Sequence, residues 1–206
     1  MYIPADFAET DRAALHGLIA AHAFGLLITV RDGAPTVSHL PFILDPDAGP
    51  YGTLYAHLAR ANPQWRDFDA TTEVLAVFQG PHAYVSPRWY RPGNAVPTWN
   101  YATVHAWGIP EIVEDADTVH RQQAALVTAY EGVGAGAWSL DSQPDAYVAG
   151  MLRGIVVFAL PIARLDGKFK LSQNRPADDR AGVVAGLRET GRPDDAALAA
   201  LMAERA

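Results

Sequence analysis

The chain has 206 residues, of which 50% are hydrophobic and 19% are charged, with a formal net charge of −7 and no cysteine. This composition excludes an intrinsically disordered chain, and the lack of cysteine excludes disulfides, thiolate metal sites and a cysteine nucleophile. The acidic balance counts against a nucleic-acid binder, which usually presents a basic face to the phosphates.

The N-terminal residues do not follow the pattern of a signal peptide, because Met1-Tyr2-Ile3-Pro4 leads directly into acidic residues. No apolar run approaches the ~18 residues that a membrane-spanning helix needs. We therefore expect a cytoplasmic protein without membrane segments.

The N-terminal part of the chain predicts one helix and a series of hairpin-connected strands. Thr10 is a suitable N-cap, and apolar residues at helical spacing after it indicate a helix over about residues 11–23. Asp32-Gly33 is a strong hairpin signal because the turn needs positive φ, which glycine adopts freely. Asn62-Pro63 can open a short helix. Strands are expected over residues 24–30, 36–44, 52–56, 74–79 and 83–86.

The rest of the chain is richer in helices. Residues 87–97 contain three prolines and Gly93, which indicates a loop, and residues 100–108 and 155–162 read as extended. Helices are expected over residues 116–131, 145–152, 179–189 and 194–204. The first of these helices is expected to bury Val119, Leu126, Val127 and Tyr130.

Short strands at close spacing predict an antiparallel β-barrel with added helices, a mostly β member of the α+β class. Helices do not alternate regularly with strands, which counts against a parallel doubly wound sheet. We expect a single domain over residues 1–206 whose last part, about residues 175–206, is helical.

Common catalytic and nucleotide-binding motifs are missing: there is no Walker loop, no H-E-x-x-H and no G-x-S-x-G. The glycine-rich residues 132–136 follow a helix rather than a strand, so they indicate a helix stop. No catalytic residue can be named. The histidines show no metal-ligand spacing, and we expect no metal site. Four of them lie in separate extended segments: His39, His57, His82 and His105.

Four stretches combine cationic, amide or hydroxyl groups with aromatic residues: 38–42, 57–65, 96–105 and 167–175. A phosphorylated aromatic ligand needs this combination, because its phosphate requires charged and polar donors and its ring requires apolar walls. The alternative is that the cations are surface residues and that the tryptophans are core residues: Trp65, Trp89, Trp99 and Trp107.

Residues 57–65, 78–90, 96–105 and 167–175 resemble the PaiB-type family of negative transcriptional regulators that bind flavin mononucleotide (FMN). Met1-Tyr2-Ile3-Pro4 with Phe7 also fits, and the resemblance extends over nearly the whole chain. The family is similar in fold to the pyridoxamine-phosphate-oxidase-like split β-barrels. The resemblance implies an antiparallel split barrel that binds FMN at a homodimer interface, with groups from both subunits.

The resemblance also implies site residues. A strand running along the flavin ring would contribute Ser38, His39, Leu40 and Pro41. The next strand and its loop would take the phosphate through His57, Arg60 and Asn62. Further ring and phosphate contacts, some from the partner subunit, would come from Trp99, Asn100, Tyr101, Lys170, Ser172 and Gln173. For His105, a structural role and a ligand role are equally open.

The resemblance makes Arg60 the main phosphate candidate, since it directly follows a strand, as the phosphate-binding loop of the resembled barrel class does, and lies between small alanines. The alternative is a surface ion pair with Asp67 or Asp69. The phosphate would then fall to Lys168, Lys170 or Arg175.

Three functions are compatible with these features. The resemblance implies a flavin-binding negative regulator, whereas the same fold class also contains flavin-dependent oxidoreductases and haem-handling proteins. No helix-turn-helix with a basic recognition helix is visible, and acidic residues offset the arginines of the last two helices. Direct DNA binding is therefore not supported, and regulation would act through a partner or a metabolite.

We expect DNA binding to be weak and salt-sensitive at most, because the net charge is −7 and no basic helix is present. A fluorescence-anisotropy titration with duplex DNA at physiological salt measures this. A sequence-specific complex at nanomolar concentration would contradict the prediction.

Overall fold

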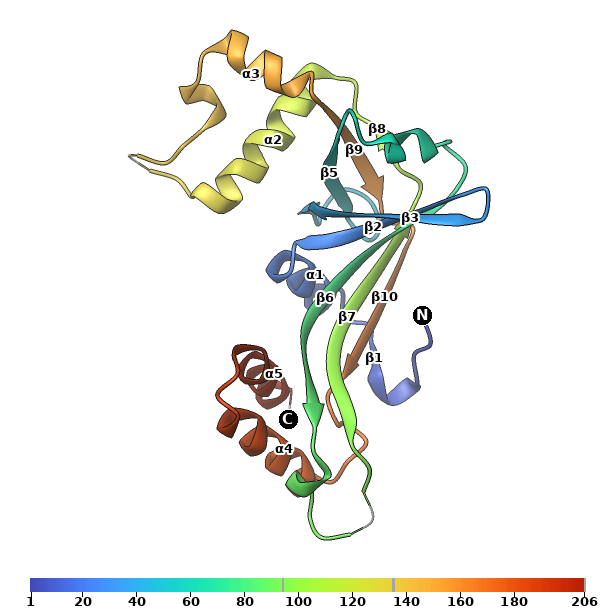
Figure 1. Cartoon of the computed structure of the whole chain (residues 1–206), viewed down its shortest axis with the longest axis vertical. Helices are drawn as coiled ribbons and strands as arrows, with labels where there is room; N and C mark the ends of the chain where they lie inside the picture. The colour runs from blue at the N-terminus through green and yellow to red at the C-terminus, as the bar shows by residue number, and fades with distance from the viewer. Residues whose placement is uncertain (94, 135, 206) are drawn as a thin grey trace. The chain divides into compact units, whose positions relative to one another are not determined.

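The computed structural model describes residues 1–93, 95–134 and 136–205 of the chain (Figure 1). It forms two compact units. The terminal unit comprises Met1–Leu18, Gln79–Val104 and Asp166–Ala206, and the central unit comprises Ile19–Phe78 and His105–Leu165. The long strands β6 (Val74–Val85) and β7 (Thr98–Gly108) contribute residues to both units. The single-domain organisation stays a prediction.

The central unit is built on antiparallel sheets. Its other strands are β2 (Phe24–Arg31), β3 (Ala34–Pro41), β4 (Ile43–Asp45), β5 (Thr53–Ala59), β8 (Glu111–Ile112) and β9 (Ile155–Pro161). The strand order is β6–β2–β3 in one sheet and β4–β5–β9–β8 in the other. The turn between β2 and β3 is the predicted Asp32-Gly33, with φ of 53° and 79°. Helices α2 (Ala116–Glu131) and α3 (Asp145–Leu152) and the 3-10 helices η2 (Pro63–Asp67) and η4 (Leu140–Ser142) complete this unit.

Three phenylalanines form the centre of its core. The rings of Phe42 and Phe78 meet edge-on with centroids 5.3 Å apart, and those of Phe42 and Phe158 with centroids 6.5 Å apart. All three side chains are at most 1% exposed. Edge-to-face packing of aromatic rings adds to the stabilisation from burial. This core joins strands from both sheets.

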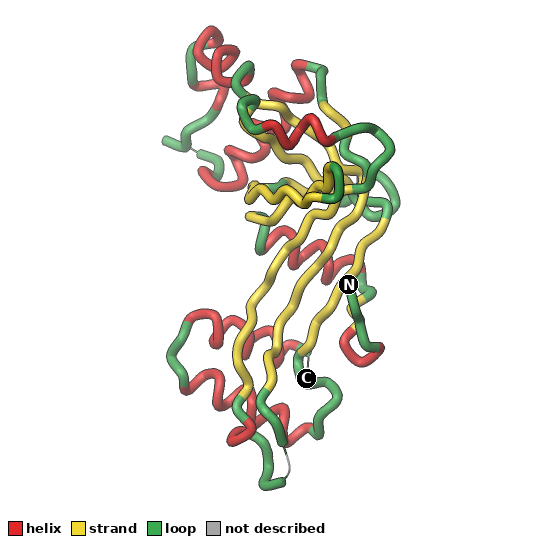
Figure 2. Tube along the Cα trace, turned by 45° about the vertical axis from the view of Figure 1, so that its right-hand side comes forward, coloured by secondary structure: helices red, strands yellow, loops and turns green. Residues whose placement is uncertain are grey.

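The terminal unit combines strands with helices. Its elements are η1 (Ala5–Phe7), β1 (Ala8–Glu9), most of α1 (Arg12–Ala21), η3 (Pro87–Trp89), most of β10 (Arg164–Lys170), α4 (Ala177–Glu189) and α5 (Pro193–Glu204). Its strands follow the order β1–β10–β7–β6. Helices α4 and α5 pack on each other (Figure 2), and α4 also packs on η3. No helix in the described part of the chain is long and apolar enough to cross a membrane.

Most predicted elements are present, with several corrections. The helices over 116–131 and 145–152 have the predicted bounds. The strands predicted over 74–79 and 83–86 are one strand, β6, because Gly80 allows the close approach of Ala102 on β7. The strand predicted over 36–44 is interrupted at Phe42. The short pairing strands β1 and β8, and β10, were not predicted.

The N-cap of α1 and the burial of α2 also differ from expectation. Asp11 rather than Thr10 caps α1, since its carboxylate accepts a hydrogen bond of 3.1 Å from the N–H of Ala13. Helix α2 buries no side chain fully, and Tyr130 is 64% exposed. The other three residues expected in the core are only partly buried: Val119, Leu126 and Val127. The main packing partners of α2 are the short elements β4 and η4, which cover little of its surface.

The loop predictions are confirmed in part. Residues 87–89 form η3, which lies inside the predicted loop 87–97, and Asn94 lies outside the described residues. Helix α2 ends at Glu131 with Gly132 at φ 75°, which confirms the predicted helix stop. Ala135, in the same glycine-rich segment, lies outside the described residues.

We expect Gly186→Ala to destabilise the chain by about 1–3 kcal/mol, the usual cost of overpacking. A methyl group at Gly186 would overlap the indole ring of Trp89, which packs on α4. Gly17→Ala on α1 is the matched control, because no atom lies within 4 Å of its added methyl group. It should be neutral or stabilising, as alanine favours helices. Urea unfolding of both variants measures the difference, and equal stabilities would contradict the prediction.

Candidate functional site

The thirteen residues expected to bind the cofactor fall into two groups, one in each unit. The central unit carries Ser38, His39, Leu40, Pro41, His57, Arg60 and Asn62. The terminal unit carries Trp99, Asn100, Tyr101, Lys170, Ser172 and Gln173. Each group has its own internal contacts.

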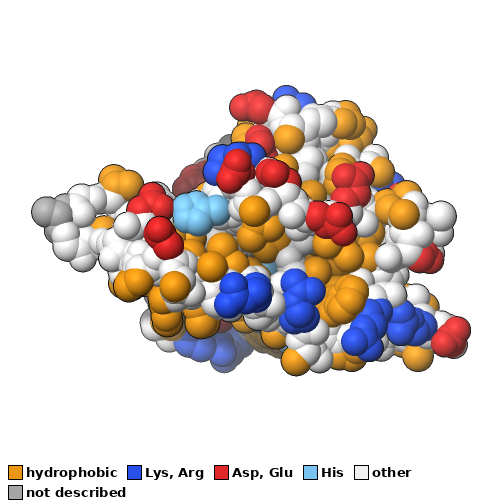
Figure 3. Space-filling view, turned by 90° about the horizontal axis from the view of Figure 1, so that it is seen from above, with side chains coloured by type: hydrophobic (Ala, Val, Ile, Leu, Met, Phe, Trp, Pro, Cys, Tyr) orange, Lys and Arg blue, Asp and Glu red, His pale blue; other side chains and the backbone are white. Residues whose placement is uncertain are grey.

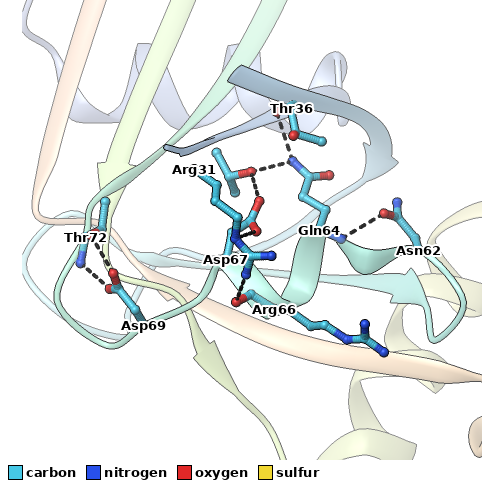
Figure 4. Close-up of polar contacts among 9 residues, drawn as sticks. Arg31, Thr36, Asn62, Gln64, Arg66, Asp67, Asp69 and Thr72 are labelled. Atoms are coloured by element: carbon cyan, nitrogen blue, oxygen red, sulfur yellow. Dashed lines mark hydrogen bonds and ion pairs between the residues drawn. The ribbon is translucent and has the colours of Figure 1, made fainter. Parts of the chain in front are cut away.

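Ser38 and Asn62 lie together in the central unit. The amide nitrogen of Asn62 donates a hydrogen bond of 3.0 Å to the Ser38 hydroxyl, which lies on β3. The amide oxygen of Asn62 accepts one of 3.0 Å from the N–H of Gln64, which caps the start of η2 (Figure 4). One side chain thus sets the position of the Ser38 hydroxyl and the direction of η2.

Gln64 is a buried anchor that the sequence analysis did not single out. Its side chain is 1% exposed, and its Nε2 donates to the main-chain oxygens of Leu27 and Thr36 at 3.2 and 3.1 Å. These bonds tie η2 to β2 and β3, and Figure 4 shows the one to Thr36. Its Oε1 has no hydrogen-bond partner among the described residues. The sequence signal for this role was only its position after the helix-opening Asn62-Pro63 pair.

A second set of polar contacts holds the other end of η2. Asp67 accepts a hydrogen bond of 2.7 Å from the Thr29 hydroxyl and pairs with Arg31 at 2.8 Å. Asp69 instead accepts hydrogen bonds from Thr72 and Thr71, which hold the pKa of its carboxyl well below the ordinary value. Both carboxylates are therefore engaged by groups other than Arg60.

Arg60 ties its own turn to the start of β9. Its Nε donates to the main-chain oxygen of Arg153 at 2.8 Å, and its Nη2 donates to that of Ile155 at 2.7 Å. The indole N–H of Trp65 donates to the Arg60 main-chain oxygen at 3.1 Å. The guanidinium is thus fixed in place through Nε and Nη2, and Nη1 takes no part in these two bonds.

The remaining residues of the central group differ in exposure. Leu40 is buried, whereas His39 is exposed and its ring stacks on that of Phe24 with centroids 6.2 Å apart. Burial lowers the pKa of His57, so the neutral imidazole is favoured. The Nδ1 of His57 is buried and has no hydrogen-bond partner among the described residues.

In the terminal unit, Asn100 links β7 to the segment after β10. Its side chain is fully buried, and its amide nitrogen donates to the Ser172 hydroxyl at 2.9 Å. The backbone of Ser172 has φ 64°, in the left-handed region. Gln173 closes the same turn, because its side chain bonds the N–H of Leu171 and the main-chain oxygen of Phe169.

Lys168, Lys170 and Arg175 form a cationic cluster in the terminal unit. The Nζ of Lys170 donates to the main-chain oxygen of Trp99 at 2.6 Å, and the Nζ of Lys168 lies 5.3 Å from the centre of the Tyr101 ring. Burial, followed by the charges of Lys168 and Arg175, lowers the pKa of Lys170. Within the described part of the chain, none of the three cations is paired with a carboxylate. An anion would relieve their mutual repulsion.

Trp99 is 52% exposed, with its ring 5.7 Å from that of His82 and 6.4 Å from that of Tyr84. It is therefore not a core residue. Among the described residues, no group of three or more His, Cys, Asp or Glu side chains could hold a metal ion.

Known proteins resemble the chain in sequence and in fold. The family described as "Putative FMN-binding domain" matches residues 1–164. The chain is 34% identical over 205 residues to "Protease synthase and sporulation protein PAI 2" of Bacillus subtilis (strain 168), covering 100% of this chain and 98% of that protein.

Solved structures show the same fold. The flavocytochrome Anf3 of Azotobacter vinelandii matches with a TM-score of 0.66 and 16% identity, covering 85% of this chain and 75% of that one. The FAD and haem binding protein of Mycobacterium smegmatis matches with a TM-score of 0.64 and 18% identity, covering 84% of this chain and 78% of that one. These matches confirm the predicted α+β fold of the split-barrel type, and the family match confirms FMN as the cofactor.

The described residues fit this cofactor. The unneutralised cluster of Lys168, Lys170 and Arg175 suits a phosphate, which is doubly charged near neutral pH. The Ser38 hydroxyl held by Asn62, and the unpartnered Nδ1 of His57, suit the polar edge of a flavin ring or its ribityl chain.

We expect Lys170→Met to weaken FMN binding more than Arg60→Ala does, because Lys170 lies within the field of two further cations, Lys168 and Arg175, that can act on the phosphate together with it. Losing one or two charge-assisted bonds should weaken FMN binding by roughly tenfold to a thousandfold, and riboflavin binding hardly at all. Parallel titrations of both ligands, with urea unfolding of each variant, measure this. If Arg60→Ala alone loses FMN affinity selectively, Arg60 rather than Lys170 binds the phosphate.

Proposed function

The chain belongs to the family of FMN-binding domains, and from this premise we propose that it is a flavin-binding negative regulator that acts as a homodimer in the cytoplasm. The single observation that carries the proposal is the 34% identity to the Bacillus subtilis relative over the full chain. The regulatory role follows the PaiB-type resemblance of the sequence.

The flavin proposal is supported by the residues that would hold it. Lys170 and its cationic neighbours, from this subunit or its partner, would take the phosphate. The backbone of β3 at Ser38 and His39 would run along the ring, and His57 of β5 would add a polar contact. Bound FMN supplies the capacity to accept and release one or two electrons. The chain's own groups would bind and orient the ligand, and the burial of His57 would keep its imidazole neutral at the site.

The homodimer proposal is supported by an apolar face of the β6–β2–β3 sheet. Alternate residues of β2 point inward, as the burial of Leu27 and Thr29 shows. The opposite side of β2 also carries apolar side chains. Two of them face solvent, since Phe24 is 68% exposed and Val30 is 55% exposed. The apolar residues on this outer face are Phe24, Leu26, Ile28 and Val30 of β2, Val37 of β3, and Leu75 and Val77 of β6, and His39 lies among them opposite Leu26.

Sheets with two apolar faces are usually covered on both, since exposed apolar patches of this kind mark interfaces. A second copy of the chain is the partner that the dimeric barrel class implies. The predicted flavin strand β3 lies at the edge of this face, which fits a binding site shared between subunits.

Regulation without direct DNA contact fits the charges of the C-terminal helices. The first turns of α4 and α5 carry four carboxylates, namely Asp178, Asp179, Asp194 and Asp195. Two of them pair with arginines, Asp178 with Arg91 and Asp195 with Arg192, so these cations are offset rather than presented to DNA phosphates. A partner protein or a metabolite would therefore connect the flavoprotein to gene expression.

We expect the purified protein to show flavin rather than haem absorption, and light scattering to give roughly twice the 22.2 kDa chain mass. Slow NAD(P)H oxidation would support a binding protein, whereas rapid turnover would favour an oxidoreductase. A haem Soret band without flavin would overturn the proposal.

The interface is tested within the same experiment by Val37→Glu, which places a carboxylate on the apolar face. Val37 is 49% exposed, so the substitution should leave the fold of the subunit intact. The variant should be monomeric and should lose most of its FMN. Val133→Glu is the matched control, because Val133 is 88% exposed and lies outside this face. A monomer that keeps the parental FMN affinity would contradict the shared site.

A further inference from the structure

The central unit contains a cavity of about 590 Å³. It is lined by residues of η2, β8, β9, α2 and α3 and by the segments that adjoin these elements. Ligand cavities in proteins commonly measure roughly 300–1,000 Å³. The cavity is therefore large enough for a small organic molecule.

Most of the cavity lining is apolar. Val119 comes from α2, Leu152 from α3, and Ile155 and Val157 from β9. Trp65 adds an aromatic wall from η2. The weak burial of α2 has its explanation here, because Val119 faces this cavity rather than the phenylalanine core.

Two arginines and one glutamate bring charge to the cavity. Arg60 is held by its two hydrogen bonds to main-chain oxygens, so its charge stays at the lining. Arg153 is exposed and forms no ion pair within the described residues. Glu114 is the one carboxylate of the lining, which leaves one positive charge in excess. An apolar cavity with this balance suits a ligand with an apolar body and one negative charge.

The cavity is separate from most residues of the expected flavin surface. Of the thirteen residues predicted to bind FMN, only Arg60 lines it. The residues of β3 and His57 of β5 contribute nothing to its lining. In Figure 3, seen from above α2 and α3, hydrophobic side chains gather between cationic side chains on one side and acidic ones on the other.

We propose that this cavity binds a small monocarboxylate with an aliphatic or aromatic body, and that Arg153 pairs with its carboxylate. Val119, Leu152 and Ile155 would cover the apolar body. The bound acid would bridge α2, α3 and β9. The proposal does not depend on the flavin, because the cavity shares only Arg60 with the flavin residues.

The test is calorimetric titration of the purified full-length protein, as isolated with its flavin, using octanoate, 1-octanol and octylamine. The three probes share one chain and differ in charge. Octanoate should bind at least tenfold more tightly than octanol, and octylamine most weakly. Arg153→Gln should reduce octanoate affinity by about tenfold, as expected for one charge-assisted contact, and leave octanol affinity unchanged.

Arg121→Gln is the matched control. It also removes one positive charge, but Arg121 lies on α2 outside the cavity lining. It should leave all three affinities unchanged. Ala149→Trp fills the cavity and should weaken both octanoate and octanol. Flavin absorbance, recorded in each titration, separates this proposal from that of the flavin site.

Three results would overturn the proposal. The first is octanoate binding no tighter than octanol, or insensitive to Arg153→Gln. The second is stoichiometric release of FMN by octanoate, which would make the cavity the flavin site. The third is no binding of any probe; if Ala149→Trp then also changes the oligomeric mass, a second copy of the chain covers the cavity instead.

Discussion

The buried amide of Gln64 is the interaction on which the arrangement of the central unit depends. It bonds main-chain oxygens of both β2 and β3, so it fixes η2 against the sheet at both strands of the hairpin. Asn62 precedes it and Trp65 follows it, and each holds another part of the candidate site. A buried amide that lost these partners would be costly, so the geometry around it tolerates little change.

In the terminal unit, by contrast, three cationic side chains lie near one another. Lys168, Lys170 and Arg175 lie close enough for their charges to lower the pKa of Lys170, and no carboxylate of the described residues pairs with them. Such an arrangement costs folding free energy, which a bound anion can offset. The contacts around Gln64 thus position the chain, whereas Lys168 and Lys170 also hold main-chain oxygens, and the three cations carry charge that, in our proposal, the FMN phosphate would offset.

Local sequence signals predicted most of the fold. The bounds of α2 and α3 follow from helical spacing and from the glycine and proline residues at their ends. The Asp32-Gly33 turn follows from the need for positive φ. Strands β1 and β8 have two residues each and exist only through pairing with β10 and β9. No local pattern encodes such pairing, so the sequence analysis missed them.

By itself, the sequence determined the family and the cofactor, because these depend on which groups occur in which order; for the residues of the site it supplied a prediction. Tertiary structure decided how those groups are engaged. Arg60 and the Asp67 carboxylate are near each other in sequence, yet Arg60 donates to residues 153 and 155 while Asp67 pairs with Arg31. Contacts between residues so far apart in the sequence depend on how the strands pair. Once the strands are paired, hydrogen-bond geometry over a few ångströms decides which group each side chain contacts.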